Sequence, residues 1–211
     1  MAAIELPPYL NSRSFKLEHV QQLTPSGQSG FIQTLSRSEP FWRAEYSTPG
    51  LDGTRYNEMI TFLELLEGSL NTFLAYDPRR PMPYAYRDQP ITANPWGAPN
   101  ATAYSYPNST ITLSGVAAGA DITAGDYISF QQGLIWYLFR STQTVTSSGA
   151  DIVLPVKPRP NIQGALNVPV RYKMACCEMK MLQQYDERDS VDEIGPQFSF
   201  TGAQYVARAP T

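Results

Sequence analysis

The sequence contains few of the residues from which catalytic and metal sites are usually built. Among its 211 residues there is one histidine, His19, and there are two cysteines, the neighbours Cys176 and Cys177. Histidine is the side chain best suited to acid–base catalysis at neutral pH and is a common metal ligand. A catalytic or metal site that needs histidine would therefore have to use His19 alone. Nucleophile elbows, His-Glu-x-x-His motifs and phosphate-binding glycine loops are also absent from the sequence. These absences predict a protein that is not an enzyme and holds no metal or cofactor.

Charged residues are scarce as well. They make up 17% of the chain, whereas about 25% is usual in soluble proteins. The formal net charge is −3, which argues against nucleic-acid binding, because domains that bind nucleic acids are usually basic. Aromatic residues reach 12%, and a surface with few charges and many aromatic rings is typical of one that contacts other chains. We therefore expect a homo-oligomer.

Long hydrophobic runs are missing too. The longest stretch without a charged residue extends from Gln89 to Ala120 and is interrupted by several prolines, which excludes a membrane helix. The first residues contain neither a basic nor an apolar segment, so no signal peptide is expected. Two adjacent cysteines do not suggest an oxidising compartment. We expect no membrane insertion.

The few reactive residues have ordinary structural interpretations. Neighbouring residues of a strand point to opposite faces, so the sequence predicts that one of Cys176 and Cys177 is buried and the other exposed. His19 continues an alternating pattern of apolar residues, which predicts a buried or hydrogen-bonded residue on the inward face of a strand. The acidic segment 186–193 lacks the spacing of a calcium-binding loop and is expected to be a solvated turn.

The residues that are abundant favour β structure. The chain has 14 glycines, 18 prolines and 13 tyrosines, which are typical of turns and strands. Apolar and polar residues alternate over 13–23 and 41–46, and in the second segment Trp42, Ala44 and Tyr46 share one face. Such alternation predicts antiparallel strands with one buried face.

One segment has helical rather than strand spacing. From Tyr56 onward, apolar residues recur three and four positions apart, which is the pattern of an amphipathic helix. Asp52 or Thr54 can cap its start, and Gly68 can end it. The sequence therefore predicts one helix over residues 54–67, packed against a sheet.

The rest of the chain indicates a discontinuous arrangement. Residues 88–106 are rich in proline and asparagine, so a long loop is predicted there. Short alternating segments recur from 109 to 156, enough for a small barrel or sandwich. Strands are again expected over 168–178 and 197–207. We infer that the first and last thirds form one domain and that the middle third is inserted into it.

Two kinds of side chain are candidates for contacts with a partner. The aromatic residues of the predicted loop could stack on sugar rings or meet a protein, and the alternative is that they seal the loop onto its own domain. Cations that stand between prolines could make charge contacts with a neighbouring subunit, and the alternative is a solvated turn. The candidate partner-contact residues are Trp96, Tyr104, Tyr106, Arg79, Arg80, Lys157 and Arg159.

Several short segments follow one another in an informative order. They are Phe-Trp-Arg-Ala-Glu-Tyr at 41–46, the helical segment 58–68, Thr-Phe-Leu-Ala-Tyr-Asp at 72–77, Ala-Gly-Asp-Tyr-Ile-Ser-Phe at 124–130, Leu-Ile-Trp-Tyr-Leu-Phe-Arg at 134–140 and Gly-Ala-Asp-Ile-Val-Leu-Pro at 149–155. With these segments in this order, the chain resembles the distal tail proteins of long-tailed, siphovirus-type bacteriophages. The resemblance covers most of residues 14–160.

The resemblance implies a mainly β fold, a β-sandwich with one amphipathic α-helix and an inserted small β-barrel, OB-like or similar. The ring-forming β-sandwich domain would comprise residues 1–105 and 165–211, and the barrel residues 106–164. Also implied is a hexameric ring at the virion tail tip, made in the host cytoplasm, that joins the tail tube protein to the baseplate hub protein. DNA would pass through its lumen without specific binding, which the acidic charge of the chain also favours.

Other functions stay open on the sequence alone. The chain could form a different tail or neck ring, a tail terminator or a head–tail connector. It could be a carbohydrate-binding module of the tail tip that uses Trp96, Tyr104 and Tyr106. A glycosidase would need two carboxylates at a defined separation, which a sequence does not reveal.

Overall fold

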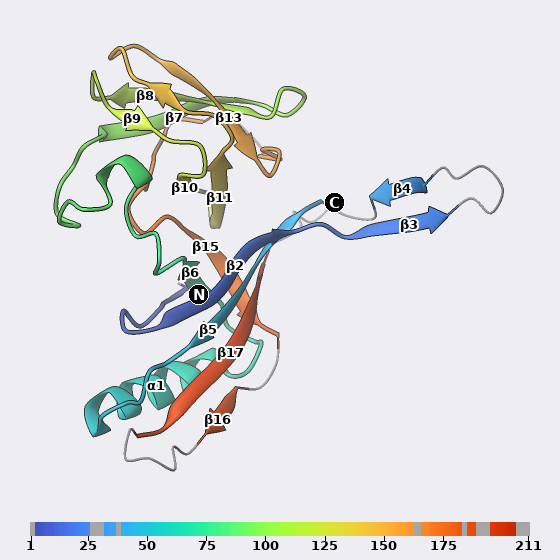
Figure 1. Ribbon diagram of the computed structural model, residues 1–211, viewed down its shortest axis with the longest axis vertical. Coiled ribbons are helices and arrows are strands. Elements are labelled where there is room, and N and C mark those ends of the chain that lie inside the picture. The colour runs from blue at the N-terminus through green and yellow to red at the C-terminus, as the bar shows by residue number, and fades with distance from the viewer. Residues whose placement is uncertain are drawn as a thin grey trace.

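The computed structural model describes residues 3–25, 32–36, 39–162, 166–182, 185–188 and 195–205 (Figure 1). These residues form a mainly β protein with one α-helix and two principal sheets. The larger sheet is covered by the helix, and the smaller sheet is nearly closed into a barrel. The expected fold class, a β-sandwich with one amphipathic helix and a small β-barrel, is confirmed.

The larger sheet has seven strands, in the order β1-β6-β15-β17-β5-β2, with β16 paired to β17. Neighbouring strands are antiparallel, except for the parallel pair β1 and β6. Strands from the start of the chain thus lie beside strands from its end, in one layer. Their bounds are β1 (Ile4–Glu5), β2 (Asn11–Glu18), β5 (Phe41–Ser47), β6 (Phe73–Tyr76), β15 (Cys176–Met181), β16 (Asp186–Arg188) and β17 (Gln197–Gln204).

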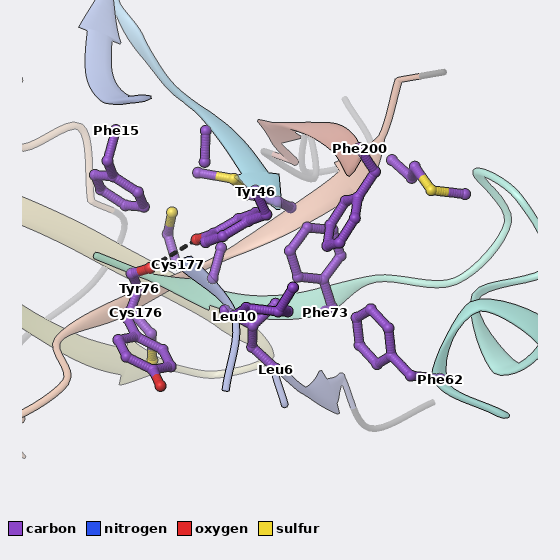
Figure 2. Packing of buried hydrophobic residues seen from close by; sticks show 14 of the residues in the cluster. Leu6, Leu10, Phe15, Tyr46, Phe62, Phe73, Tyr76, Cys176, Cys177 and Phe200 are labelled. Atoms are coloured by element: carbon purple, nitrogen blue, oxygen red, sulfur yellow. Dashed lines mark hydrogen bonds between the residues drawn. The ribbon is translucent and has the colours of Figure 1, made fainter. Parts of the chain in front are cut away.

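One face of this sheet forms the core, as the alternation in β5 predicts. Trp42, Ala44 and Tyr46 are buried, and the residues between them are only partly buried. On the neighbouring strand, Phe200 lies opposite Tyr46 with the two ring centres 5.4 Å apart. Figure 2 shows these rings and the hydrogen bond of 2.6 Å that the Tyr46 hydroxyl donates to the backbone oxygen of Tyr76. The core is therefore aromatic, and its buried hydroxyl has a partner.

The α-helix, α1 (Gly53–Leu66), packs on this same face. The side chain of Asp52 caps its start by accepting a hydrogen bond of 2.9 Å from the backbone N–H of Arg55. From its buried side, Phe62 places its ring 6.0 Å from Phe73 and 6.1 Å from Phe200. The predicted helix is confirmed, with each end within one residue of its expected position.

The second sheet has six strands, in the order β10-β11-β13-β8-β7-β14. Beyond β14 the chain returns to β10, where Ser129 and Arg171 exchange backbone hydrogen bonds of 2.8 and 2.7 Å. This bridge joins the two edges of the sheet, which is why the sheet is nearly closed. The bounds are β7 (Gly97–Ser105), β8 (Thr110–Val116), β10 (Tyr127–Gln132), β11 (Ile135–Ser141), β13 (Ile152–Lys157) and β14 (Val168–Pro169).

The barrel has a hydrophobic core of its own, to which Leu113, Phe130 and Leu154 contribute fully buried side chains. A short two-stranded sheet, β9 (Asp121–Ile122) and β12 (Val145–Thr146), lies beside it. The 3-10 helix η1 (Tyr84–Tyr86) rests on β9, because the Tyr86 hydroxyl accepts a hydrogen bond of 2.7 Å from the backbone N–H of Asp121. The connection that follows β6 is thereby fixed to the barrel.

The hairpin β10–β11 joins the barrel to the larger sheet. The indole N–H of Trp42 donates a hydrogen bond of 2.9 Å to the backbone oxygen of Leu138. The ring of Tyr127 lies 5.6 Å from that of Trp42 and 5.8 Å from that of Phe15. Both Tyr127 and Leu138 belong to the core of the larger sheet, although their strands belong to the barrel. Buried rings and a buried hydrogen bond therefore couple the two units.

A further pair of strands extends beyond the body of the molecule. β3 (Gln21–Pro25) and β4 (Ile32–Ser36) pair with each other in a sheet of their own. They follow β2 and precede β5, and Figure 1 shows them projecting away from both principal sheets. We term this pair of strands the arm.

Three expectations about strands, turns and loops are wrong. The segment 88–106 is not a loop throughout, because its second half forms β7, which pairs with β8 and β14 on its two sides. Part of the acidic segment 186–193 is not a turn, since β16 pairs there with β17, and residues 189–193 lie outside the described part of the chain. His19 is exposed and follows the end of β2.

The second sheet includes more of the chain than the segment 106–164. β7 lies before this segment and β14 after it, and Trp96 and Tyr172 belong to the barrel core. The division into residues 1–105 with 165–211 and an inserted domain 106–164 stays a prediction.

Candidate functional site

Trp96 is a core residue of the barrel rather than a partner contact. Its side chain is fully buried, and its ring stacks on that of Tyr172 at 4.6 Å. Its indole N–H donates a hydrogen bond of 3.1 Å to the backbone oxygen of Asp121. The expectation that Trp96 contacts a partner is therefore wrong, because the chain enters β7 directly after it and the ring fills the barrel. A sugar-binding surface made of Trp96, Tyr104 and Tyr106 would therefore lack the indole ring of Trp96, which is not accessible.

Tyr104 is also bound within the chain. It is half-buried on β7 and packs against the barrel core. Its hydroxyl donates a hydrogen bond of 2.6 Å to the backbone oxygen of Ile162, which ties β7 to the segment that follows β13. For this residue the alternative interpretation, a ring that seals its own domain, describes the structure better.

Tyr106 and Arg159 are brought together on the surface. Tyr106 is 39% exposed, and the guanidinium of Arg159 lies 5.9 Å from the centre of its ring. The Tyr106 hydroxyl donates a hydrogen bond of 2.9 Å to the carboxylate of Glu39, which stands between the arm and β5. Lys157 is exposed at the end of β13. These three candidates remain accessible to a partner.

Arg79 is paired with a carboxylate of its own chain. Its guanidinium donates hydrogen bonds of 3.0 and 3.2 Å to the two oxygens of Asp77, which is 3% exposed. These bonds raise the pKa of Arg79 further above its usual value. A two-pronged bond to a buried carboxylate fixes the arginine in place, so Arg79 shapes the surface around it.

Arg80 lines a cavity of about 430 Å³ that we term the arginine cavity. One wall is the segment 79–87, which includes η1, and the other is the turn 123–127 at the start of β10. Arg79 and Arg87 line it as well. The cavity therefore has three guanidinium groups in a chain whose net charge is −3.

One buried carboxylate holds the two walls of the arginine cavity together. Asp126 is 4% exposed and accepts hydrogen bonds of 2.7 Å from the backbone N–H groups of Tyr84 in one wall and Thr123 in the other. Burial raises the pKa of Asp126, and these two bonds and the charge of Arg80 oppose the rise. Since both of its oxygens are used, Asp126 serves as a brace for the cavity.

Sequence reasoning missed Tyr84, Arg87 and Asp126 as parts of a site. Tyr84 is 61% exposed at the cavity, and the guanidinium of Arg87 lies 4.7 Å from the centre of its ring. The three arginines within residues 79–87 could have indicated a positively charged site from the sequence. The turn 123–127 has no comparable sequence pattern, because only the fold brings it against that segment.

Both neighbouring cysteines are buried, so the expectation that one is exposed is wrong. Cys176 is 1% exposed and Cys177 is fully buried. The strand β15 lies between β6 and β17, and the barrel meets it where the Ser129 hydroxyl accepts a hydrogen bond of 3.0 Å from the backbone N–H of Cys176. Burial raises the pKa of the Cys176 thiol to about 11 and that of Cys177 well above its usual value. Such thiols stay protonated and inert at neutral pH.

In the described part of the chain, no group of three or more His, Cys, Asp or Glu side chains is placed to hold a metal ion. The helices described here include none that is long and apolar enough to cross a membrane.

In comparisons with known proteins, no family model matches the chain, and no curated protein matches it.

Proposed function

We propose that the chain is a structural subunit of a phage tail tip and has no catalytic activity. In this proposal six copies form a distal tail ring that joins the tail tube protein to the baseplate hub protein. The ring leaves a lumen through which DNA passes without specific binding. The proposal rests on the resemblance of the segments 41–77 and 124–155 and on one structural feature, the arm.

The arm supports assembly because its backbone stands apart from both principal sheets of its own copy (Figure 1). Its two strands hydrogen-bond to each other, and they project away from both principal sheets (Figure 1). An isolated two-stranded hairpin is only marginally stable in water, and its outer edges offer unpaired backbone groups to another chain. A neighbouring copy would supply the missing surface.

The edge of the larger sheet supports the same interpretation. β2 is the last strand in the order of that sheet, and on its far side no described strand pairs with it. Arg13 and Lys16 are exposed along it. Exposed edge strands are the usual places where one chain extends the sheet of another, so β2 and the arm together form one continuous assembly surface.

Deleting the arm tests the proposal. In this variant an Asn-Gly turn replaces residues 19–40, because Glu18 lies opposite Phe41 at the end of the β2–β5 pairing and a two-residue turn fits there. We expect the full chain to form rings of six copies in electron micrographs, alone or with tube or hub protein. The armless variant should keep its circular dichroism spectrum and remain a monomer.

The matched control is Tyr9→Phe, which removes an exposed hydrogen bond to the backbone oxygen of Arg55 and leaves the arm intact. It should assemble like the original chain. A full chain that stays a monomer, even when mixed with tube and hub protein, would overturn the proposal. Rings formed by the armless variant would show that another surface drives assembly.

The position of the ring within a phage particle distinguishes the proposal from its nearest alternatives. A distal tail ring lies at the tip, whereas a terminator or a head–tail connector lies near the head. Gold-labelled antibody against the purified chain should therefore mark the tail tip in micrographs. Labelling at the neck would contradict the proposal and favour one of these other rings.

A further inference from the structure

The arginine cavity has more positive than negative charge in its lining. Three arginines line it together with one acidic residue, Asp126, both of whose oxygens accept backbone hydrogen bonds. Arg79 is matched by the buried Asp77. Among the described residues, the side chain of Arg80 takes part in no hydrogen bond or ion pair. The contact of Arg87 with Asp88, at 3.7 Å between exposed side chains, is weak.

The cavity is built in advance of any ligand. Besides the brace at Asp126, the backbone N–H of Gly125 donates a hydrogen bond of 2.9 Å to the oxygen of Ser141, and that of Met174 donates one of 2.8 Å to the oxygen of Pro81. These bonds attach each wall to the body of the protein. A cavity of about 430 Å³ admits a few side chains, whereas a DNA duplex is too wide to enter it.

We propose that the arginine cavity binds carboxylates of the acidic segment 186–193 of a second copy of this chain. The segment reads Asp-Glu-Arg-Asp-Ser-Val-Asp-Glu, so it is rich in the ligand that guanidinium groups bind best in proteins. Asp186 and Glu187, its described acidic residues, are exposed. The inference rests on the proposed oligomer, and it names which two surfaces meet.

The two surfaces lie apart within one copy. The Tyr56 hydroxyl donates a hydrogen bond of 3.2 Å to Glu187, which places the described start of the acidic segment beside α1. The cavity lies at the start of β10, and in Figure 1 β10 and β16 are separated along the longest axis of the molecule. The segment of one copy therefore meets the cavity of the next copy. Head-to-tail contact between two different patches is the arrangement that closes into rings.

Charge reversal in two separate variants tests the pairing. One variant has Arg80→Glu and Arg87→Glu, and the other has Asp186→Lys and Glu187→Lys. For each full-length variant alone, the association constant measured by analytical ultracentrifugation should be at least tenfold lower than that of the original chain. An equimolar mixture should recover it, because each reversed cavity can then meet a reversed segment. Asp151→Lys is the control for charge alone, since Asp151 is exposed before β13 and belongs to neither of the two surfaces, and it should associate normally.

The outcomes separate this inference from the proposed ring. If all variants assemble like the original chain, the cavity does not hold the acidic segment, and the ring proposal stands. If the original chain never assembles, a fluorescent peptide of residues 185–194 still tests the cavity: it should bind the full chain at least tenfold more tightly than the Arg80→Gln/Arg87→Gln variant. Equal binding by both proteins, or displacement of the peptide by a short DNA duplex, would overturn the inference.

Discussion

Gly202 shows at the scale of one residue how tightly the larger sheet is packed. A methyl group added there would lie 2.8 Å from a ring carbon of Phe73 and 3.2 Å from the sulfur of Met179. Both neighbours are fully buried, so they have little room to move. We expect Gly202→Ala to lower the free energy of unfolding by about 1–3 kcal/mol, as measured by urea denaturation.

Gly53→Ala is the control, because nothing lies within 4 Å of the added methyl at the start of α1 and alanine favours the helix. Equal losses in both variants would show that crowding is not the cause.

The buried thiol of Cys176 makes stability depend on pH. Its pKa is about 11 in the folded protein against 9.0 ordinarily, so between these values the unfolded chain has released a proton that the folded protein still holds. The free energy of unfolding should therefore be highest below pH 9 and fall as the pH rises toward 11, by at most about 2–3 kcal/mol from this group.

Cys176→Ala measures that contribution directly. Urea denaturation at pH 8, 9, 10 and 11 should give a shallower decline for the variant than for the original chain. Cys177→Ala provides a comparison at the adjacent buried thiol, whose pKa is also raised. An identical pH dependence in the original chain and in Cys176→Ala would show that the thiol is not protected by burial.

The cysteine pair and Trp96 also show what sequence reasoning can reach for single residues. Alternation along a strand correctly gives opposite directions to neighbouring side chains, but it does not reveal whether both faces of that strand are covered. For Cys176 the second face is covered by the barrel, which comes from a distant part of the chain. Trp96 is similar, because its stacking partner Tyr172 is far away in sequence.

At the scale of elements, predictability follows the strength of the local pattern. The helix α1 and the strand β5 bury residues at the periods that their sequences display, so both could be recognised in advance. β7 displays no such period, and its burial is irregular with shifts in its register against β8. Such a strand forms because its neighbours pair with it, and this information lies outside its own residues.

The helix cap gives a prediction at this scale. Asp52→Ala removes the acceptor of the hydrogen bond from the backbone N–H of Arg55, so it should lower the free energy of unfolding by about 1 kcal/mol. Asp52→Asn keeps an oxygen in the same place and should cost much less. Thermal denaturation of both variants provides the measurement, and equal losses would mean that charge, rather than capping, is what Asp52 contributes.

On the scale of the whole molecule, the features on which the proposed assembly depends come from distant parts of the chain. The arginine cavity needs the connection after β6 and the turn before β10, and Asp126 joins them. The larger sheet needs strands from both ends of the sequence. Composition indicated a β protein, which the structure confirms, and predicted contacts with other chains. The positions of the proposed surfaces depend on long-range pairing, which local patterns do not encode.

The coupling of the two units at Trp42 gives the last prediction. Trp42→Phe removes the hydrogen bond to the backbone oxygen of Leu138 and loosens the ring contact with Tyr127. Trp96→Phe is matched to it, because Trp96 is equally buried and also donates its indole N–H to a backbone oxygen, but within the barrel. Each substitution should cost about 2 kcal/mol or more, through a lost bond and a poorer fit.

Only the substitution at the junction should change how the protein unfolds. In calorimetry the original chain and Trp96→Phe should each give one transition whose calorimetric and van't Hoff enthalpies agree. The reason is that the buried contacts of Trp42 with the β10–β11 hairpin join the barrel to the larger sheet in both proteins. Trp42→Phe should broaden or split the transition as the barrel and the larger sheet begin to unfold separately. If Trp42→Phe retains one transition with agreeing enthalpies, other contacts between β10–β11 and the larger sheet must be sufficient to hold the two units together.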